Sequence, residues 1–205
     1  SFIGVDPIPV VHGLTLGEYA RMANGEGWLK DHEKCELTVI PMLGYHHGMG
    51  YRLPGPPSPN LRTQQAILLY PTLCFFGGTV ISDGRGTRFP FEMIGNPELK
   101  GKYRFSFTPV PMPGMTEHPP MQGTVCYGLD LRHYDTDLLR KSGRLHLEWI
   151  TEFYKAYPDK AAFFRKESTR DSTRIAYHFD ELAGTDQLRK QIIQGKSLSE
   201  IRESW

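Results

Sequence analysis

The sequence predicts the end of an α/β domain over residues 1–60, followed by an α+β domain over residues 61–205. Three observations support this division. A helix pattern and a strand pattern come first, and no partner strand precedes them. Glycine and proline then crowd residues 44–60, so no regular element is expected there. Strand patterns between residues 91 and 131 finally give way to helix patterns from Asp135 onward.

The overall composition lies in the range of globular proteins. Of the 205 residues, 39% are hydrophobic and 23% are charged, which is enough for a sizeable core. The formal net charge of +1 gives no reason to expect nucleic acid or an acidic lipid surface as a partner. No apolar run is long enough to cross a membrane. Cys35, Cys74 and Cys126 form no C-x-x-C pair, so we expect buried free thiols rather than a zinc or redox site.

The first domain should contribute one helix and one strand. Thr15 followed by Glu18 has the spacing of a capping box, which predicts a helix that begins at Thr15 and ends near Gly25. Residues 36–42 alternate weakly but are dense in Leu37, Val39 and Ile40, and Pro41 ends this run. This pattern predicts a strand that is buried on at least one side.

The second domain should open with a helix over residues 63–76, which Pro71 is expected to kink or end. Short runs rich in aromatic and branched residues then predict three strands, at residues 91–94, 103–109 and 124–131. The second of these strands alternates through Phe105 and Phe107. A proline-rich connection separates the second strand from the third.

Helices should fill the remainder of the second domain. Residues 145–157 carry an apolar stripe at helical spacing, which we interpret as a core-facing surface rather than a cofactor-binding one. Two more helices are predicted over residues 187–194 and 197–205. The second of these begins with a capping box made by Ser197 and Glu200.

An arginine between two glycines stands at the centre of the stretch Gly78–Glu92. Glycines on either side of Arg85 allow sharp turns of the backbone. The planar guanidinium of an arginine matches a carboxylate or a phosphate in shape and charge. We therefore predict that this loop recognises an anionic group on a substrate. The alternative is that Arg85 only pairs with a nearby acidic side chain.

Several other site types are not indicated. The Gly84-Arg85-Gly86 loop lacks the lysine of a P-loop, and Pro90 argues against a helix directly behind it. His46 and His47 are adjacent, and neighbouring side chains in extended chain point apart, so they are poorly placed to chelate one metal ion. No G-x-S-x-G motif is present. We predict neither a metal nor a cofactor.

Carboxylates near the arginine are the remaining candidates for chemistry. Glycoside hydrolysis needs two carboxyl groups that face one bond, and Asp83 and Glu92 flank the loop. The structural alternatives are a turn residue for Asp83 and an ion pair of Glu92 with Arg85 or Arg88. For Glu18 the capping box is the favoured reading. We therefore predict Glu92 and Asp83 as the catalytic pair.

Taken together, the motifs resemble those of the exo-β-N-acetylmuramidase (NamZ/YbbC-like) family, which is glycoside hydrolase family 171. The motifs that carry the resemblance occur in the family's order: His12-Gly13-Leu14-Thr15 with Gly17-Glu18, then Pro57-Ser58-Pro59-Asn60, then Gly84-Arg85-Gly86-Thr87 with Pro90-Phe91-Glu92. Phe179–Gly184 and the tail Gln191–Trp205 are also similar to the family. The resemblance covers nearly the whole chain.

The resemblance implies a two-domain enzyme with an N-terminal Rossmann-like domain, a C-terminal α+β domain and a cleft between them. Members of the family release terminal N-acetylmuramic acid from the non-reducing end of peptidoglycan fragments. This chain would hold the end of the first domain and most of the second, and glutamates implicated in the chemistry would lie before Ser1. A periplasmic or extracellular location is implied by the family, while oligomeric state and stereochemical outcome are left open.

The resemblance also gives roles to the substrate-facing residues. N-acetylmuramic acid carries a lactyl ether that ends in a carboxylate, and Arg85 suits that group. The other residues expected at the peptidoglycan-derived sugar are Gly86, Thr87, His12, Tyr45, His46 and Asn60. Two functions stay open: a glycosidase for which this chain supplies mainly the substrate-facing domain, and a module that binds cell-wall sugar without cutting it.

Overall fold

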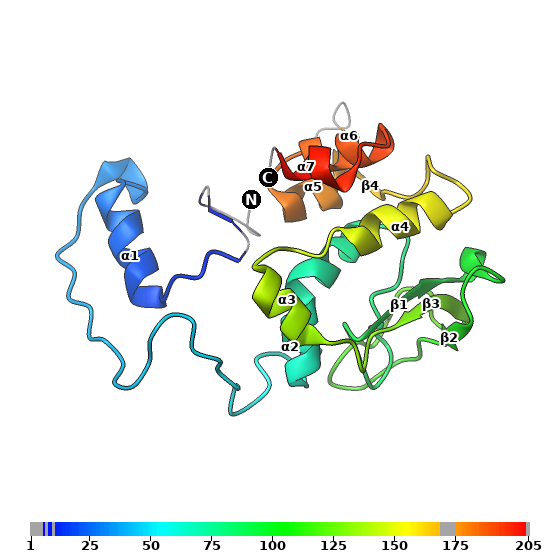
Figure 1. The fold of residues 1–205 in the computed structure, drawn as a ribbon, viewed down its shortest axis with the longest axis horizontal. Helices are drawn as coiled ribbons and strands as arrows, with labels where there is room; N and C mark the ends of the chain where they lie inside the picture. The colour runs from blue at the N-terminus through cyan, green and yellow to red at the C-terminus, as the bar shows by residue number, and fades with distance from the viewer. Residues whose placement is uncertain (1–5, 7, 10, 169–174, 204–205) are drawn as a thin grey trace. The chain divides into compact units, whose positions relative to one another are not determined.

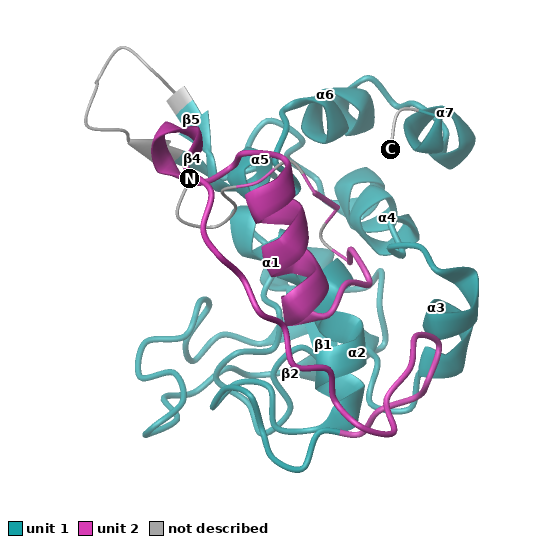
Figure 2. Ribbon diagram, turned by 90° about the vertical axis from the view of Figure 1, so that its left-hand side faces the viewer, with its two compact units in different colours: residues 1, 53–205 teal, residues 2–52 magenta. Residues whose placement is uncertain are grey.

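The computed structural model describes residues 6, 8–9, 11–168 and 175–203 of the chain (Figure 1). The chain forms two compact units, Phe2–Arg52 and Leu53–Trp205, which Figure 2 colours separately. Helices and a small antiparallel sheet make up the larger unit, so the expected mixture of helix and sheet is confirmed. The Rossmann-like character of the first domain and its end near residue 60 stay predictions.

The smaller unit contains one α-helix, α1 (Leu16–Gly25), followed by a 3-10 turn at Lys30–His32. The capping box is present as expected: the Thr15 side chain accepts from the Glu18 amide, and the Glu18 carboxylate accepts from the Thr15 amide. A strand over residues 36–42 was expected there, and this prediction is wrong. A strand requires a hydrogen-bonded neighbour, and none of the described residues pairs with this segment, which leaves Ile40 88% exposed.

The larger unit begins with α2 (Gln64–Leu73), which runs directly into a 3-10 turn, η2 (Cys74–Gly78). The hydroxyl of Thr63 caps α2 by accepting from the Ala66 amide. Of the two expected effects of Pro71, a kink or an end, the helix end does not occur at the proline itself, because α2 continues to Leu73. Pro71 lies near the carboxyl end of α2, and the chain tightens into 3-10 geometry soon after it, which is common at helix ends.

The sheet has the order β1-β3-β2, and its central strand is antiparallel to both neighbours. The strands are β1 (Met93–Asn96), β2 (Phe105–Phe107) and β3 (Cys126–Asp130), so all three predicted strands are present, each within a few residues of its expected place. A 3-10 turn, η3 (Pro97–Leu99), follows β1. In the register between the strands, Gly95 faces Gly128, where a Cβ on Gly128 would meet the Ile94 carbonyl oxygen at 1.9 Å.

The carboxyl-terminal part is helical apart from one hairpin. The helices are α3 (Thr136–Ser142), α4 (Glu148–Ala156), α5 (His178–Ala183), α6 (Gln187–Ile193) and α7 (Leu198–Arg202). The hairpin of β4 (Lys166–Ser168) and β5 (Ile175–Tyr177) was not predicted. The capping box of α7 is confirmed, whereas the predicted extension of this helix to Ser204 and Trp205 lies outside the described residues.

The hydrophobic core belongs to the larger unit. Its buried apolar side chains lie between Ala66 and Ile201, and no described residue before Leu53 is buried. Trp149, Ile150 and Phe153 of α4 are buried, so the apolar stripe is a core face as expected. Within the described residues, no helix is long and apolar enough to cross a membrane.

The three cysteines are free, but they are not equally buried. Cys126 is buried and Cys74 is partly buried, and burial raises the pKa of the Cys74 thiol to about 12 and that of the Cys126 thiol to about 11. Cys35 is exposed, which contradicts the expectation that all three are buried. It lies on the smaller unit, where the Asn24 side chain bonds both its backbone amide and its carbonyl at the surface.

Candidate functional site

The loop around Arg85 is closed by its own backbone. Ser82 exchanges two hydrogen bonds with Gly95 of β1, and the Phe91 amide donates to the Asp83 carbonyl at 2.8 Å. Inside the loop, the Thr87 hydroxyl donates to the Gly84 carbonyl at 2.7 Å. Thr87, which was expected to face the substrate, therefore also fixes the turn.

The two glycines beside Arg85 are required by packing within the protein. Both have positive φ, +80° for Gly84 and +85° for Gly86, a region in which other residues are strained. A Cβ on Gly86 would lie 2.5 Å from the Cβ of Pro119, and the Val110 amide donates to the Gly86 carbonyl at 2.8 Å. The 109–124 segment, which the bond from the Gly123 amide to the Pro109 carbonyl closes, thus packs directly on the Arg85 loop. Gly86 is buried beneath it.

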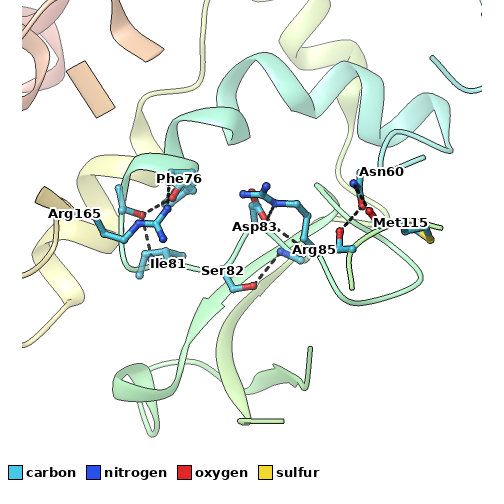
Figure 3. Close-up of polar contacts among 12 residues, drawn as sticks. Asn60, Phe76, Ile81, Ser82, Asp83, Arg85, Met115 and Arg165 are labelled. Atoms are coloured by element: carbon cyan, nitrogen blue, oxygen red, sulfur yellow. Dashed lines mark hydrogen bonds and ion pairs between the residues drawn. The ribbon is translucent and has the colours of Figure 1, made fainter. Parts of the chain in front are cut away.

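Arg85 is gripped by the carboxylate of Asp83. The guanidinium Nε lies 3.0 Å from Oδ1 and Nη2 lies 2.9 Å from Oδ2 (Figure 3). The Asp83 residue is only 2% exposed, whereas the Arg85 side chain is 34% exposed. Burial by itself would lower the pKa of Arg85, but the paired carboxylate outweighs it and leaves that pKa above its usual value. The pair fixes the direction of an arginine that stays charged.

Arg85 and Asp83 border a small open pocket of about 70 Å³. Its wall is built from η2 and the following residues, from the 109–124 segment and from the residue before β4. The lining residues are Phe76, Gly77, Thr79, Val80, Ile81, Asp83, Arg85, Pro120, Met121 and Arg165. Such a volume holds a group of a few atoms, such as a carboxylate, better than a whole sugar ring.

Glu92 directly precedes β1 in the chain, and it is not among the residues that line this pocket. The Thr63 hydroxyl donates to its Oε1 at 2.5 Å, and only 4% of the residue is exposed. Burial raises the pKa of Glu92, against the opposing effects of the Thr63 hydrogen bond and the nearby Arg132 guanidinium. Neither Arg85 nor Arg88, the two ion-pair partners considered from the sequence, is paired with it among the described residues.

The side chain of Asn60 bonds to the 109–124 segment at Met115 and Thr116 (Figure 3). Its Oδ1 accepts from the Thr116 hydroxyl at 3.0 Å, and its Nδ2 donates to the Met115 carbonyl at 3.4 Å. The amide of Asn60, expected to contact the sugar, is thus already engaged on both sides. In the structure, the Asn60 side chain holds the 109–124 segment, which contributes Pro120 and Met121 to the pocket wall.

Comparison with known proteins places these features in a family. A model of the C-terminal part of the exo-β-N-acetylmuramidase NamZ matches residues 68–205, and a model of its N-terminal part matches residues 1–65. The chain belongs to the exo-β-N-acetylmuramidase NamZ family. The resemblance inferred from the motifs is thereby confirmed, and every residue that lines the pocket lies in the region matched by the C-terminal model.

Comparison with two relatives shows how much of a NamZ family protein this chain covers. The peptidoglycan β-N-acetylmuramidase NamZ of Bacillus subtilis (strain 168) is 33% identical over 218 residues, an alignment that covers 100% of this chain and 49% of the relative. A crystal structure of a DUF1343 family protein from Bacteroides fragilis NCTC 9343 is 42% identical with a TM-score of 0.88, and it is matched over 100% of this chain and 54% of its own. The chain spans about half the length of these relatives.

The remaining predicted residues of this NamZ family chain lie in the smaller unit. His12 accepts from the Leu14 amide through Nδ1 at 3.0 Å, and its ring stacks on Tyr19. His46 Nδ1 lies 3.0 Å from the carbonyl oxygen of its neighbour His47. Tyr45 is 36% exposed and meets the His47 ring edge-on. These side chains are accessible, and their predicted roles at the sugar stay predictions.

One histidine of the smaller unit has a partner that the sequence did not suggest. Nε2 of His47 lies 2.8 Å from Oε1 of Glu18, the residue of the capping box. This hydrogen bond, together with the one from the Thr15 amide, lowers the pKa of Glu18 to about 2. Glu18 therefore ties residue 47 to the start of α1, in agreement with the structural reading of that glutamate.

Sequence reasoning missed two residues near Arg85. Tyr70 of α2 is 40% exposed, and its partial burial raises the pKa of its hydroxyl. Arg165 lines the pocket although it lies far from Arg85 in the sequence. No local pattern marks Arg165, because only the pairing of residues 163–165 with residues 78–80 brings it there. Within the described residues, no cluster of three or more histidine, cysteine or acidic side chains has the geometry of a metal site.

Proposed function

We propose that this chain is the substrate-facing part of a peptidoglycan exo-β-N-acetylmuramidase that releases terminal N-acetylmuramic acid from the non-reducing end of peptidoglycan fragments. Family membership supports the class of reaction. The observation that carries the assignment to this chain is Arg85, an aligned guanidinium at a pocket of about 70 Å³. The lactyl carboxylate of N-acetylmuramic acid is a small anionic group of the kind that such a pocket would accept.

The same contact would separate the muramic sugar from its commonest relative. N-acetylglucosamine has a hydroxyl where N-acetylmuramic acid has the lactyl ether, so it offers no carboxylate to Arg85. A hydrogen bond to a charged group contributes about 1.5–3 kcal/mol. That difference would favour the muramyl sugar by roughly one to two orders of magnitude.

Hydrolysis requires one carboxyl group to protonate the leaving oxygen and another to act on the opposite face. Asp83 spends both carboxylate oxygens on Arg85, so we assign it to positioning that arginine rather than to proton transfer. Glu92 has a raised pKa, which suits a general acid, and it remains the catalytic candidate of the chain. We propose that its partner lies in the half of the family's length that this chain does not span.

The alternative is a module that binds cell-wall sugar without cutting it. The observation that favours it is that both predicted carboxylates are already engaged, Asp83 with Arg85 and Glu92 with Thr63. Either function acts on peptidoglycan, so we propose a periplasmic or extracellular site of action.

The deciding experiment compares this chain with a longer protein in which it is extended to the full length of the family. Each is incubated with 4-nitrophenyl β-N-acetylmuramide and, as a control, with 4-nitrophenyl β-N-acetylglucosaminide, and release of nitrophenol is followed. We expect the longer protein to cleave only the muramide and the chain alone to cleave neither. Cleavage of both sugars at equal rates would contradict the role of the pocket. Failure of the longer protein to cleave the muramide would favour the binding module.

A further inference from the structure

The pocket beside Arg85 is bordered by a second guanidinium that no sequence motif marks. We propose that Arg165 is a second specificity-determining residue of this pocket and adds an attraction for an anionic sugar substituent to that of Arg85. The inference rests on the proposed function, because it concerns the same subsite. The sequence motif marks only Arg85 as a residue that contacts the substrate; a role for Arg165 emerges from the structure.

Arg165 is held in place by its backbone. Its amide donates to the Gly78 carbonyl at 3.0 Å, and two residues earlier the Phe163 carbonyl accepts from the Val80 amide at 3.0 Å. Phe163 and Phe164 are 0% and 3% exposed. Two buried aromatic rings and these backbone bonds thus fix the main chain at Arg165, while its own side chain is exposed at the pocket wall.

Both guanidiniums converge on Gly77. The Arg165 Nη2 donates to the Gly77 carbonyl. A Cβ placed on Gly77 would lie 3.9 Å from Nη2 of Arg85. The two arginines, which come from segments far apart in the chain, therefore approach the same glycine at the pocket wall. A ligand atom near Gly77 would lie within reach of both.

The two arginines differ in their bonding partners: Arg85 is paired with a carboxylate, whereas Arg165 is bonded to a backbone carbonyl. Asp83 is the only acidic residue among those that line the pocket, and both of its oxygens bond to Arg85. Arg165 bonds to a neutral carbonyl, and among the described residues it has no carboxylate partner. The pocket thus has two cations and one anion on its wall. Within the part of the chain that the structure describes, the charge of Arg165 faces no carboxylate, while the charge of Arg85 is matched by Asp83.

The test uses the whole chain and measures binding by heteronuclear NMR titration with three sugars: N-acetylmuramic acid, its methyl ester and N-acetylglucosamine. Arg165→Gln removes the charge but retains side-chain hydrogen bonding. We expect it to weaken binding of N-acetylmuramic acid about tenfold, as for one lost charge-assisted hydrogen bond, and to leave the methyl ester unchanged. Arg104→Gln, at an exposed arginine that does not line the pocket, should bind all three sugars as the unaltered chain does.

A second variant tests the geometry without removing charge. At Gly77 an added methyl group would meet Leu182 and Arg85 at 3.8 and 3.9 Å, which is ordinary contact, so Gly77→Ala should fold normally. It should nevertheless crowd a ligand held between the two arginines and weaken N-acetylmuramic acid binding several-fold. Unchanged binding in this variant would show that the carboxylate does not lie between the arginines.

The outcomes separate this inference from the proposed function. If the unaltered chain prefers N-acetylmuramic acid to its methyl ester, and Arg85→Gln abolishes this preference while Arg165→Gln retains it, the inference is overturned and the proposed function stands. If the unaltered chain shows no preference among the three sugars, the proposed function fails and this inference fails with it. The inference is supported if the preference for N-acetylmuramic acid over its methyl ester falls in Arg165→Gln and is unchanged in Arg104→Gln.

Discussion

At the scale of single residues, the pairing of Arg85 with Asp83 limits what each can do. A buried carboxylate whose two oxygens contact one guanidinium, one through a hydrogen bond and one in an ion pair, is poorly placed to give or take a proton during hydrolysis. The arginine gains a fixed orientation, its side chain is 34% exposed, and it lines the pocket. The sequence alone permitted either a paired or a ligand-binding arginine, and the structure shows a pair that still borders a pocket.

Replacing Arg85 by lysine should impair recognition although the charge is kept. Lysine cannot contact both oxygens of Asp83 as the planar guanidinium does, so its ammonium would not be held at the pocket. In the longer protein we expect kcat/KM for the muramide to fall about tenfold or more. Arg88→Lys is the matched control, because Arg88 is exposed in the same loop and does not line the pocket. Equal kinetics for both variants would remove Arg85 from the site.

Glu92 gives a pH-dependent prediction. Its pKa is raised in the folded chain, mainly by burial, so folding favours the protonated form and the ionised form opposes folding near neutral pH. Glu92→Gln keeps an oxygen for the Thr63 hydroxyl and removes the charge. The variant should therefore melt above the unaltered chain at pH 7, and the difference should shrink as the pH falls through the raised pKa.

Glu92→Ala serves as the contrast. It removes the charge together with the acceptor of the Thr63 hydroxyl, and an unpaired buried donor costs about 1–3 kcal/mol. This variant should melt below Glu92→Gln at every pH. A constant difference between the glutamine variant and the unaltered chain from pH 7 to acid would show that Glu92 does not have a raised pKa.

At the scale of elements, sequence patterns predicted the helices and strands that depend on local interactions. They did not predict features that depend on pairing between distant segments. The alternation around Phe105 and Phe107 predicted β2, and the Thr15 and Ser197 capping boxes predicted the starts of α1 and α7. Residues 36–42 have the composition of a strand, but a strand needs a partner that the described chain does not supply. Arg165 reached the pocket only through pairing across the fold, so no local pattern could reveal it.

The contact between the 109–124 segment and the Arg85 loop can be tested with two glycine variants. Gly86→Ala adds a methyl group 2.5 Å from Pro119 at a φ of +85°, so clash and backbone strain act together. Gly114→Ala, in the same segment, has a φ of +71° but nothing within 4 Å of the added methyl group. We expect a loss of about 1 kcal/mol for Gly114→Ala and about 2–4 kcal/mol for Gly86→Ala in chemical unfolding. Equal losses would show that strain alone matters.

At the scale of the whole molecule, stability resides in the larger unit. All of the buried apolar side chains found in the described residues lie between Ala66 and Ile201. Composition predicted a sizeable core, but it could not say that residues 11–52 would contribute no buried side chain to it.

Residues 53–205 should therefore fold without residues 1–52. We expect the shorter chain to melt within about 5 °C of the full chain, since a loss of about 1 kcal/mol shifts the midpoint by roughly 2–4 °C at this size. Circular dichroism melts of the two chains measure the difference. A fall of tens of degrees would show that the smaller unit stabilises the core.

The bond from the Val110 amide to the Gly86 carbonyl provides a built-in reporter of pocket opening. The 109–124 segment contributes Pro120 and Met121 to the pocket wall, so this amide can exchange its hydrogen with solvent only when the wall separates from the Arg85 loop. A sugar that binds only the closed pocket should slow that exchange about a hundredfold at a concentration a hundred times its Kd. Deuterium uptake at one backbone position would then reveal which sugars occupy the pocket, without any bond being cut.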